Sequence, residues 1–432
     1  MARSTRHLSR RNFLSLAGLT ASASVLTACG GSGGGDASAT GPITFANWSG
    51  SDSAFEAVLS SYEQQRSLSV ERQANVPFAD YQTRFRALLA GGSPPDVMRM
   101  DDDTIRELAG KQQILDLRPY IERGGIDPTA YFESTWRFPV QSDGSHTGVA
   151  IGIQPRMFFY NRTMFEEAGV PLPPTTWTDD GWKWEDFLRT AQALTVPGQR
   201  WGALVYNDTG YENTFAVNNG GEGRYSADGT RFALADPAGV EAVQWVADLT
   251  LVHEVQPPWG EIQADQADLQ MFAAGKIGML SGVTGWAPYF RENVRDFEWD
   301  VAPVPGRVRQ QQEGSLIVFV IPANADQPDA AWDLLNYMCG PDAGRMFAEA
   351  FAFIPVHKAS AEAATNLQGG PQHASLYVEA AEHHQSVNAT SGTSQSVQIY
   401  RPQLDLVYTG QATAAQALGD IRPQVEAVLS GI

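Results

Sequence analysis

Alternating apolar and polar positions open the folded part of the chain, and helical spacing follows directly. Residues 43–48 alternate, which predicts a strand, and the polar run 49–52 ends it. Apolar residues then recur every three or four positions from Phe55 to Tyr62, as on one face of a helix. The same succession repeats as strand 67–74, helix 81–89, strand 96–100 and helix 104–109. This alternation is typical of an α/β fold with a largely parallel sheet.

The second half of the chain continues with strands and helices but has less regular spacing. Residues 154–156 interrupt an apolar strand at 148–160, and residues 184–194 form a clearly amphipathic helix. Further elements are expected as helices 240–251 and 267–274, strands 277–280, 299–304 and 316–321, and a helical remainder. Cys339 shares one helical face with Trp332 and Leu335, so we expect a buried, unreactive thiol.

The N-terminus has the layout of an export signal. Arginines without acidic residues precede an apolar stretch from Phe13 to Leu26. Residues 9–14, with Arg10 and Arg11, resemble a twin-arginine signal, and an ordinary secretory signal is the alternative. Residues 26–29, Leu-Thr-Ala-Cys, resemble a bacterial lipobox. The resemblance implies that residues 1–28 are a signal peptide and that Cys29 carries a lipid anchor that includes palmitate.

Composition narrows the class of protein further. The 432 residues include 30 Lys and Arg against 49 Asp and Glu, which gives a net charge of −19. This acidic balance argues against a nucleic acid as the binding partner. Two cysteines exclude a disulfide framework and a cysteine-based zinc site, and no cofactor motif is present. Residues 29–41 form a flexible Gly-rich linker after the lipidated cysteine. Within it, residues 30–34 match G-x-S-x-G but lack the strand and helix of a hydrolase elbow.

Several blocks, taken in order, resemble the extracellular solute-binding proteins of ABC importers, of the sugar-binding type (family 1). The order of the blocks carries the resemblance, which extends over roughly residues 42–430. The blocks are 159–170, 173–177, 272–280, 285–286, 300–306, 314–321, 331–337 and 354–355.

The resemblance implies a two-lobe periplasmic-binding-protein fold of type II, with a ligand cleft between α/β lobes joined by hinge strands. It places residues 42–150 and 301–323 in the first lobe, and residues 151–300 and 324–432 in the second. The chain would cross near Ile151, Val301 and Ala323. The implied protein is a non-enzymatic monomer without cofactor, lipid-anchored outside the cytoplasmic membrane, delivering a carbohydrate to an ABC permease.

The ends of the first predicted strands offer candidate sugar contacts. Sugars need aromatic faces for their C–H groups and fixed polar groups for their hydroxyls. Trp48 could stack and Ser49 could bond a hydroxyl, with a core tryptophan as the alternative. Asp101 and Asp102 could accept from vicinal hydroxyls, while Asp103 is expected to cap the following helix.

Other candidates follow from the resemblance and from the strand break. Gln154 and Arg156 lie in the break, where Arg156 offers a rigid donor fork or, alternatively, a surface ion pair. Trp286 is the strongest single candidate for stacking, because Gly285 before it permits close approach. The remaining candidates are Tyr211, Asn213, Glu313, Gly314, Ser315 and Phe353, the last with a core position as its alternative.

Two other functions fit parts of the sequence. A secreted glycoside hydrolase could draw its two carboxylates from Asp101, Asp102, Glu212 and Glu313, although none lies in a recognisable catalytic motif. A receptor for a cation such as a polyamine would use the same acids. Arg156 and the tryptophan content favour a neutral or weakly acidic sugar instead.

Overall fold

The computed structural model describes residues 41–48, 52–101, 104–141, 143–206, 210–264, 266–365, 370–390 and 392–431. All of the described residues belong to one compact unit of the chain, Thr40–Ile432. The expected signal peptide, Cys29, Ser49 and Asp102 lie outside the described residues.

A six-stranded sheet combines the start of the chain with strands from its last third. Its order is β10-β4-β9-β3-β1-β2. The strands are β1 (Ile43–Ala46), β2 (Val70–Arg72), β3 (Val97–Met100), β4 (Val149–Gln154), β9 (Ser315–Val320) and β10 (Ile354–Pro355). β1 pairs in parallel with β2 and β3, whereas β9 runs antiparallel to both β3 and β4.

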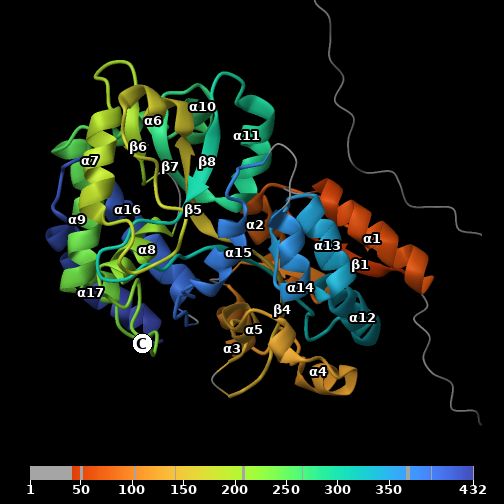
Figure 1. Ribbon diagram of the computed structural model, residues 1–432. Helices are drawn as coiled ribbons and strands as arrows, with labels where there is room; N and C mark the ends of the chain where they lie inside the picture. Colours follow the sequence, from red (N-terminus) through yellow and green to blue (C-terminus); the bar gives the residue numbers. More distant parts are fainter. Residues whose placement is uncertain are drawn as a thin grey trace, which may run out of the picture. The chain divides into compact units, whose positions relative to one another are not determined.

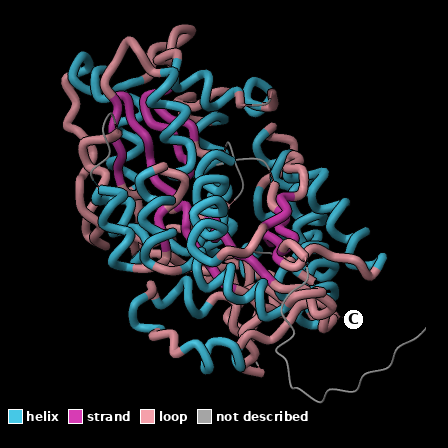
Figure 2. The backbone as a smooth tube through the Cα atoms, turned by 90° about the vertical axis from the view of Figure 1, so that its right-hand side faces the viewer, coloured by secondary structure: helices cyan, strands magenta, loops and turns pink. Residues whose placement is uncertain are grey.

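A four-stranded sheet uses consecutive strands from the middle of the chain. Its order is β6-β7-β5-β8. The strands are β5 (Arg156–Asn161), β6 (Trp201–Leu204), β7 (Ile277–Val283) and β8 (Trp299–Ala302). β5 is antiparallel to β7 and β8, and only β6 with β7 is parallel among the described pairings of this sheet. Figure 2 shows the strands of the chain in two separate groups.

Helices surround both sheets (Figure 1). Those before β7 are α1 (Asp52–Arg66), α2 (Phe78–Gly91), α3 (Ile105–Gly110), α4 (Arg118–Gly124), α5 (Glu133–Arg137), α6 (Arg162–Ala168), α7 (Trp184–Leu194), α8 (Tyr211–Asn218), α9 (Pro237–Leu251) and α10 (Ala267–Ala273). Those after it are α11 (Ala287–Asn293), α12 (Pro328–Cys339), α13 (Pro341–Glu349), α14 (Lys358–Ala361), α15 (Ser375–Glu382), α16 (Thr393–Tyr408) and α17 (Ala414–Leu429).

The expected alternation of strands and helices is present, but the expected largely parallel sheet is wrong. Three of the eight described strand pairings are parallel. The antiparallel pairing of β4 with β9 arises because β4 leads out of the first sheet at Gln154, and β9 leads back into it beside β4. One strand leaves the sheet and the other enters it at the end that faces the other lobe, so the two neighbouring strands run in opposite directions.

The chain passes between the two sheets more than once. Ile151 is within β4, so the first crossing follows Gln154, and the second occupies residues 303–314. No crossing occurs at Ala323 in the described chain, since α12 contacts β4 and β10 pairs with β4. The third crossing comes between β10 and α16, which packs on α9 of the second lobe. Residues 328–355 therefore belong with the first lobe and not, as expected, with the second.

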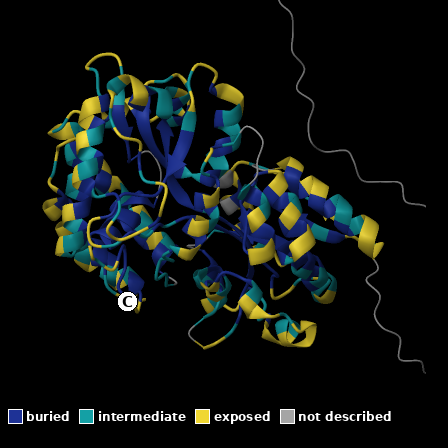
Figure 3. Ribbon diagram, in the orientation of Figure 1, coloured by how far each residue is buried: buried dark blue, intermediate teal, exposed yellow. Residues whose placement is uncertain are grey.

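The core is apolar and follows the sheets. Figure 3 shows the strands buried and the outward faces of the helices exposed. Cys339 is 2% exposed, as its helical face predicts, and burial raises the pKa of its thiol to about 11. Among the described residues, no helix has the length and apolar character needed to span a bilayer.

Candidate ligand-binding cavity

One cavity of about 420 Å³ is lined by residues from both lobes. Seven of the expected site residues line it: Trp48, Asp101, Gln154, Arg156, Glu313, Gly314 and Ser315. The other lining residues were not anticipated: Arg99, Gly210, Arg224, Leu316, Val397 and Arg401. The volume is within the range of small-molecule sites.

The carboxyl ends of β1 and β3 form the first wall of the cavity. Trp48 follows β1 and is half-buried, and the guanidinium of Arg99 lies 3.8 Å from the centre of its ring. Tyr81 supports the ring edge-on at 5.3 Å. Adjacent parallel strands end at the same sheet edge, which is where α/β sheets bind ligands. This wall therefore offers an aromatic face, with a cation on it.

Asp101 ends the same wall and also organises the turn after β3. Its Oδ1 accepts hydrogen bonds from the backbone N–H of Thr104 at 3.0 Å and from the Thr104 hydroxyl at 2.9 Å. Thr104 is the N-cap residue of α3, and Asp103, which was expected to cap this helix, lies outside the described residues. The bonds fix the carboxylate beside the cavity.

The floor of the cavity is the pair of crossing strands. Gln154 at the end of β4 pairs with Ser315 at the start of β9. A side chain on Gly314 would place Cβ 2.4 Å from the Gln154 carbonyl oxygen, so only glycine permits this approach. The side-chain amide of Gln154 donates to the Ala352 carbonyl at 3.2 Å.

The second wall is built around two buried arginines. Arg156 is 2% exposed; its backbone N–H donates to Gln312 Oε1 at 2.9 Å and its guanidinium to Ser281 Oγ at 3.3 Å. Gly210, with φ +103°, lies against this guanidinium and the Glu313 carboxylate. Glu313 in turn forms an ion pair with Arg224, which is 5% exposed.

Glu212 lies behind this wall and supports it. Its carboxylate accepts from the Tyr400 hydroxyl at 2.9 Å, from Arg401 at 3.4 Å and from the Gly210 backbone N–H at 3.1 Å. Burial opposes ionisation, but the guanidinium groups of Arg401 and Arg224 outweigh it and lower the pKa of Glu212 below its usual value. Glu212 is therefore a buried carboxylate that holds α16 against α8.

His384 lies under the second crossing. Its Nδ1 accepts from the backbone N–H of Gly314 at 3.4 Å, and its Nε2 is 3.2 Å from the Ser386 hydroxyl. Burial lowers the pKa of His384 to about 4, so the ring is neutral near pH 7.

Four expected site residues do not line the cavity. The ring of Trp286 packs on Gly282 of the preceding strand β7, where an added Cβ would lie 2.3 Å from the ring. Phe353 is 3% exposed and packs on Phe55 and Phe347 in the core of the first lobe.

Tyr211 and Asn213 are buried in α8. The Tyr211 ring lies 6.1 Å from Tyr408, and Asn213 Oδ1 accepts from the backbone N–H of Arg224 at 2.6 Å. Both hold the second wall from behind.

Three arginines line the cavity but were not anticipated from the sequence, and only one of them has a local sequence signal. Arg99 is a charged residue between buried methionines and lies two positions before Asp101, on the same side of the strand, so it could have been found. Arg224 lies in a Gly-rich loop and Arg401 in a helix, and neither has a local signal. Only the tertiary structure brings them to the cavity.

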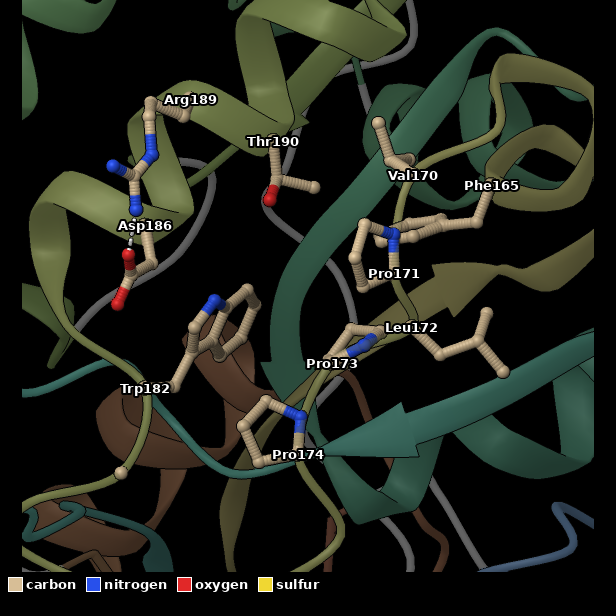
Figure 4. A pocket seen from close by; sticks show the side chains of 11 residues that line it. Phe165, Val170, Pro171, Leu172, Pro173, Pro174, Trp182, Asp186, Arg189 and Thr190 are labelled. Carbon is tan, nitrogen blue, oxygen red and sulfur yellow. Dashed lines mark hydrogen bonds and ion pairs between the residues drawn. The ribbon is translucent and has the colours of Figure 1, made fainter.

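A second cavity of about 410 Å³ lies on the four-stranded lobe alone. Figure 4 shows Pro171, Pro173 and Pro174 on one side of it, and Asp186, Arg189 and Thr190 of α7 on the other. Asp186 and Arg189 form an ion pair there. None of the expected site residues lines this cavity, so it is not the candidate site.

The sequence matches a protein-family model described as "Bacterial extracellular solute-binding protein" over residues 57–374, most of the chain. The chain belongs to this family. Curated relatives are binding proteins of Brucella abortus and Brucella suis, 25% identical over 242 residues. The match covers 54% of this chain and 56% of those relatives, so the chain spans little more than half of their length.

Solved structures of solute-binding proteins share the fold of this family member. An ABC substrate-binding protein of Listeria monocytogenes in complex with cycloalternan superposes with a TM-score of 0.81 at 21% identity, covering 90% of this chain and 99% of that one. The GacH receptor of Streptomyces glaucescens, solved unliganded and with acarbose, gives 0.77 at 18% identity, covering 91% and 99%. UgpB of Mycobacterium tuberculosis with glycerophosphocholine gives 0.75 at 19% identity, covering 91% and 99%. The two-lobe fold predicted from the sequence is confirmed by these likenesses.

Proposed function

We propose that the protein is the carbohydrate-binding receptor of an ABC importer, which captures a sugar or oligosaccharide and delivers it to the permease. The observation that carries the proposal is the cavity between the lobes. It combines the aromatic face of Trp48 with acceptors at Asp101 and Glu313 and donors at Arg156. Stacking and charge-assisted hydrogen bonds are the two contacts that sugars use. Two of the solved relatives named above are described with cycloalternan and acarbose.

Capture would proceed by rotation of the lobes about the crossing segments. Gln312 joins two of these segments, because its Oε1 accepts from Arg156 and its Nε2 donates to the Ala380 carbonyl at 2.8 Å. Because the hydrogen bonds of this buried side-chain amide are costly to break, the backbone rotation would occur at crossing residues on either side of Gln312. Closure would remove water from the sugar and strengthen its polar contacts.

The protein would bind without hydrolysing. Asp101 and Glu313 do line one cavity, which keeps a glycoside hydrolase as the second candidate. A glycosidase pairs a proton-donating acid with an ionised carboxylate. Glu313 forms an ion pair with Arg224, and Asp101 Oδ1 accepts two hydrogen bonds from Thr104, so neither carboxyl group is placed as a proton donor to a sugar. Incubation of purified protein with bound oligosaccharide should return the sugar unchanged. Product in excess of protein, lost in Glu313→Gln, would establish the hydrolase instead.

A lipid on Cys29 would hold the mature monomer outside the cytoplasmic membrane. The lipobox and the Gly-rich linker support this, and a lipid anchor with a soft linker suits a receptor near its permease. Wild type should partition into detergent and carry the acyl mass, and Cys29→Ala should lose both. Equal membrane retention of the two forms would exclude this anchor.

Thermal denaturation across mono- and oligosaccharides tests the central proposal, since a ligand of the folded state raises its stability. At a free ligand concentration of 100 times Kd, the free energy of unfolding should rise by about 2.7 kcal/mol. If no carbohydrate raises the melting temperature while a polyamine does, the carbohydrate proposal fails.

A further inference from the structure

We propose that the ligand of this receptor is an oligosaccharide, whose units extend from the candidate cavity at Trp48 into a larger cavity between the lobes, called here the polar cavity. The polar cavity measures about 830 Å³, against about 420 Å³ for the candidate cavity. This inference rests on the proposed function, because it names the class of carbohydrate and the place of its further units.

The polar cavity is lined by residues of both lobes, as the candidate cavity is. Its lining includes Arg106, Gln141 and Asp143 of the first lobe and Ala227, Asn388 and Thr390 of the second. The turn at 227–229 packs on residues 388–390, since a Cβ on Gly229 would lie 2.6 Å from Thr390 Cγ2 and 2.9 Å from the Asn388 carbonyl oxygen. These two segments therefore form one continuous wall.

Two short segments of the chain lead directly from the candidate cavity to the polar cavity. On the first lobe, Asp101 of the candidate cavity accepts from the backbone N–H of Thr104 at 3.0 Å, and Arg106 of the polar cavity is two positions further along. On the second lobe, Arg224 lines the candidate cavity and Ala227 lines the polar cavity. A fully extended chain spans these three residues in at most about 11 Å.

The start of α16 makes a third connection. The backbone N–H of Thr390, which lines the polar cavity, donates to Thr393 Oγ1 at 2.8 Å. Thr393 begins α16, and Val397 of the candidate cavity lies one helical turn later, a rise of about 6 Å. Each lobe thus carries its wall from one cavity into the next, which makes the two cavities neighbours.

The chemistry of the polar cavity favours sugar units over other extensions of a ligand. Among its described lining residues, Val140 is the largest aliphatic side chain and none is aromatic. The other side chains are small or carry amide, hydroxyl, carboxylate or guanidinium groups. An alkyl chain would bury little apolar surface here, whereas hydroxyl groups would find donors and acceptors. Trp48 would stack on one unit, and the polar cavity would add hydrogen bonds to the units that follow.

Titration calorimetry with sugars of increasing length tests the inference. The probes are the one- to five-unit members of the malto-, cello-, xylo- and galacto-oligosaccharide series. In at least one series, we expect the affinity to rise about tenfold or more from the disaccharide to the tetrasaccharide. If the affinity stops rising at the disaccharide, or the monosaccharide binds best, the inference is overturned and the proposed function stands. If none of the sugars binds, the proposed function fails and the inference fails with it.

A substitution that fills the polar cavity identifies the place of the further units. Ala227→Trp puts a large side chain there without disturbing the core, because Ala227 is exposed. It should weaken tetrasaccharide binding about tenfold more than disaccharide binding.

Ala415→Trp is the matched control, because Ala415 is exposed on α17 of the same lobe and lines neither cavity. It should change neither affinity. An Ala227→Trp variant that keeps the full gain from the longer sugar contradicts the inference. Because the wild-type series is measured independently, a variant that folds poorly does not remove the test.

Discussion

The two walls of the cavity are built in different ways. The first wall consists of the ends of two strands that are neighbours in the sheet: Trp48 follows β1, and Arg99 and Asp101 lie at the end of β3. The second wall is assembled from a helix start, a Gly-rich loop and α16, which bring Gly210, Arg224 and Arg401 together. The first wall follows the rule that α/β sheets bind at strand ends. The second depends on buried ion pairs between segments far apart in the chain.

The largest expected effect comes from breaking the second wall. Arg224→Met removes a buried guanidinium partner of Glu313, whose own side chain is only 14% exposed. We expect the free energy of unfolding to fall by about 3–5 kcal/mol, measured by urea denaturation at pH 7.

Arg189→Met is the control, because it breaks an ion pair whose arginine side chain is 74% exposed. It should cost less than about 1 kcal/mol. Similar losses in the two variants would show that the second wall does not depend on its buried pair.

His384, which contacts the crossing segment at Gly314, should make the free energy of unfolding depend on pH. The pKa of His384 is lowered by burial to about 4 from 6.5, so between these values the unfolded chain binds a proton that the folded protein does not. Its contribution is complete above pH 6.5 and is lost as the pH falls towards 4, on the order of 3 kcal/mol.

His384→Asn keeps a hydrogen-bond acceptor near Gly314 but cannot be protonated in this range. Unfolding free energies measured from pH 7.5 to 4.5 should therefore fall less steeply in the variant. Parallel curves for the two proteins would exclude His384 as the cause.

The first wall should affect binding more than stability. Trp48→Ala removes the aromatic face and the ring under Arg99, and should weaken sugar binding by about 2 kcal/mol, roughly thirtyfold. Trp286→Ala is the matched control, since its ring covers Gly282 and not the cavity. It should lower the melting temperature and leave the affinity near that of wild type. The reverse outcome would restore Trp286 as the stacking residue.

The smallest effect concerns the turn that ends the first wall. Asp101→Ala loses both bonds to Thr104 and should destabilise the protein by about 1 kcal/mol, whereas Asp101→Asn keeps an acceptor and should cost a few tenths. Equal losses in chemical denaturation would mean that the charge, and not the turn, matters.

These differences explain how much the sequence could predict. Local patterns located α7 at 184–194 and most of the strands, because each has its own apolar periodicity. Trp48 and Asp101 could be predicted since strand ends share an edge. Arg224 and Arg401 could not, because only tertiary contacts bring a loop to Glu313 and a late helix to Glu212. Trp286 was misplaced because Gly285 suggested access for a ligand, whereas Gly282 provides space for the ring itself.

The order in which the two sheets can be completed during synthesis follows from the crossings. The four-stranded sheet needs only residues 156–302, a continuous segment. The six-stranded sheet contains β1 but has its central strand β9 at 315–320 and its edge β10 at 354–355. Contacts of long sequence separation form late, because closing long loops costs entropy. The edges of β3 and β4 that face β9 therefore stay unpaired until β9 has been made, whereas the four-stranded sheet can form earlier; the lobe around that sheet is completed only when α16 and α17 pack on α9.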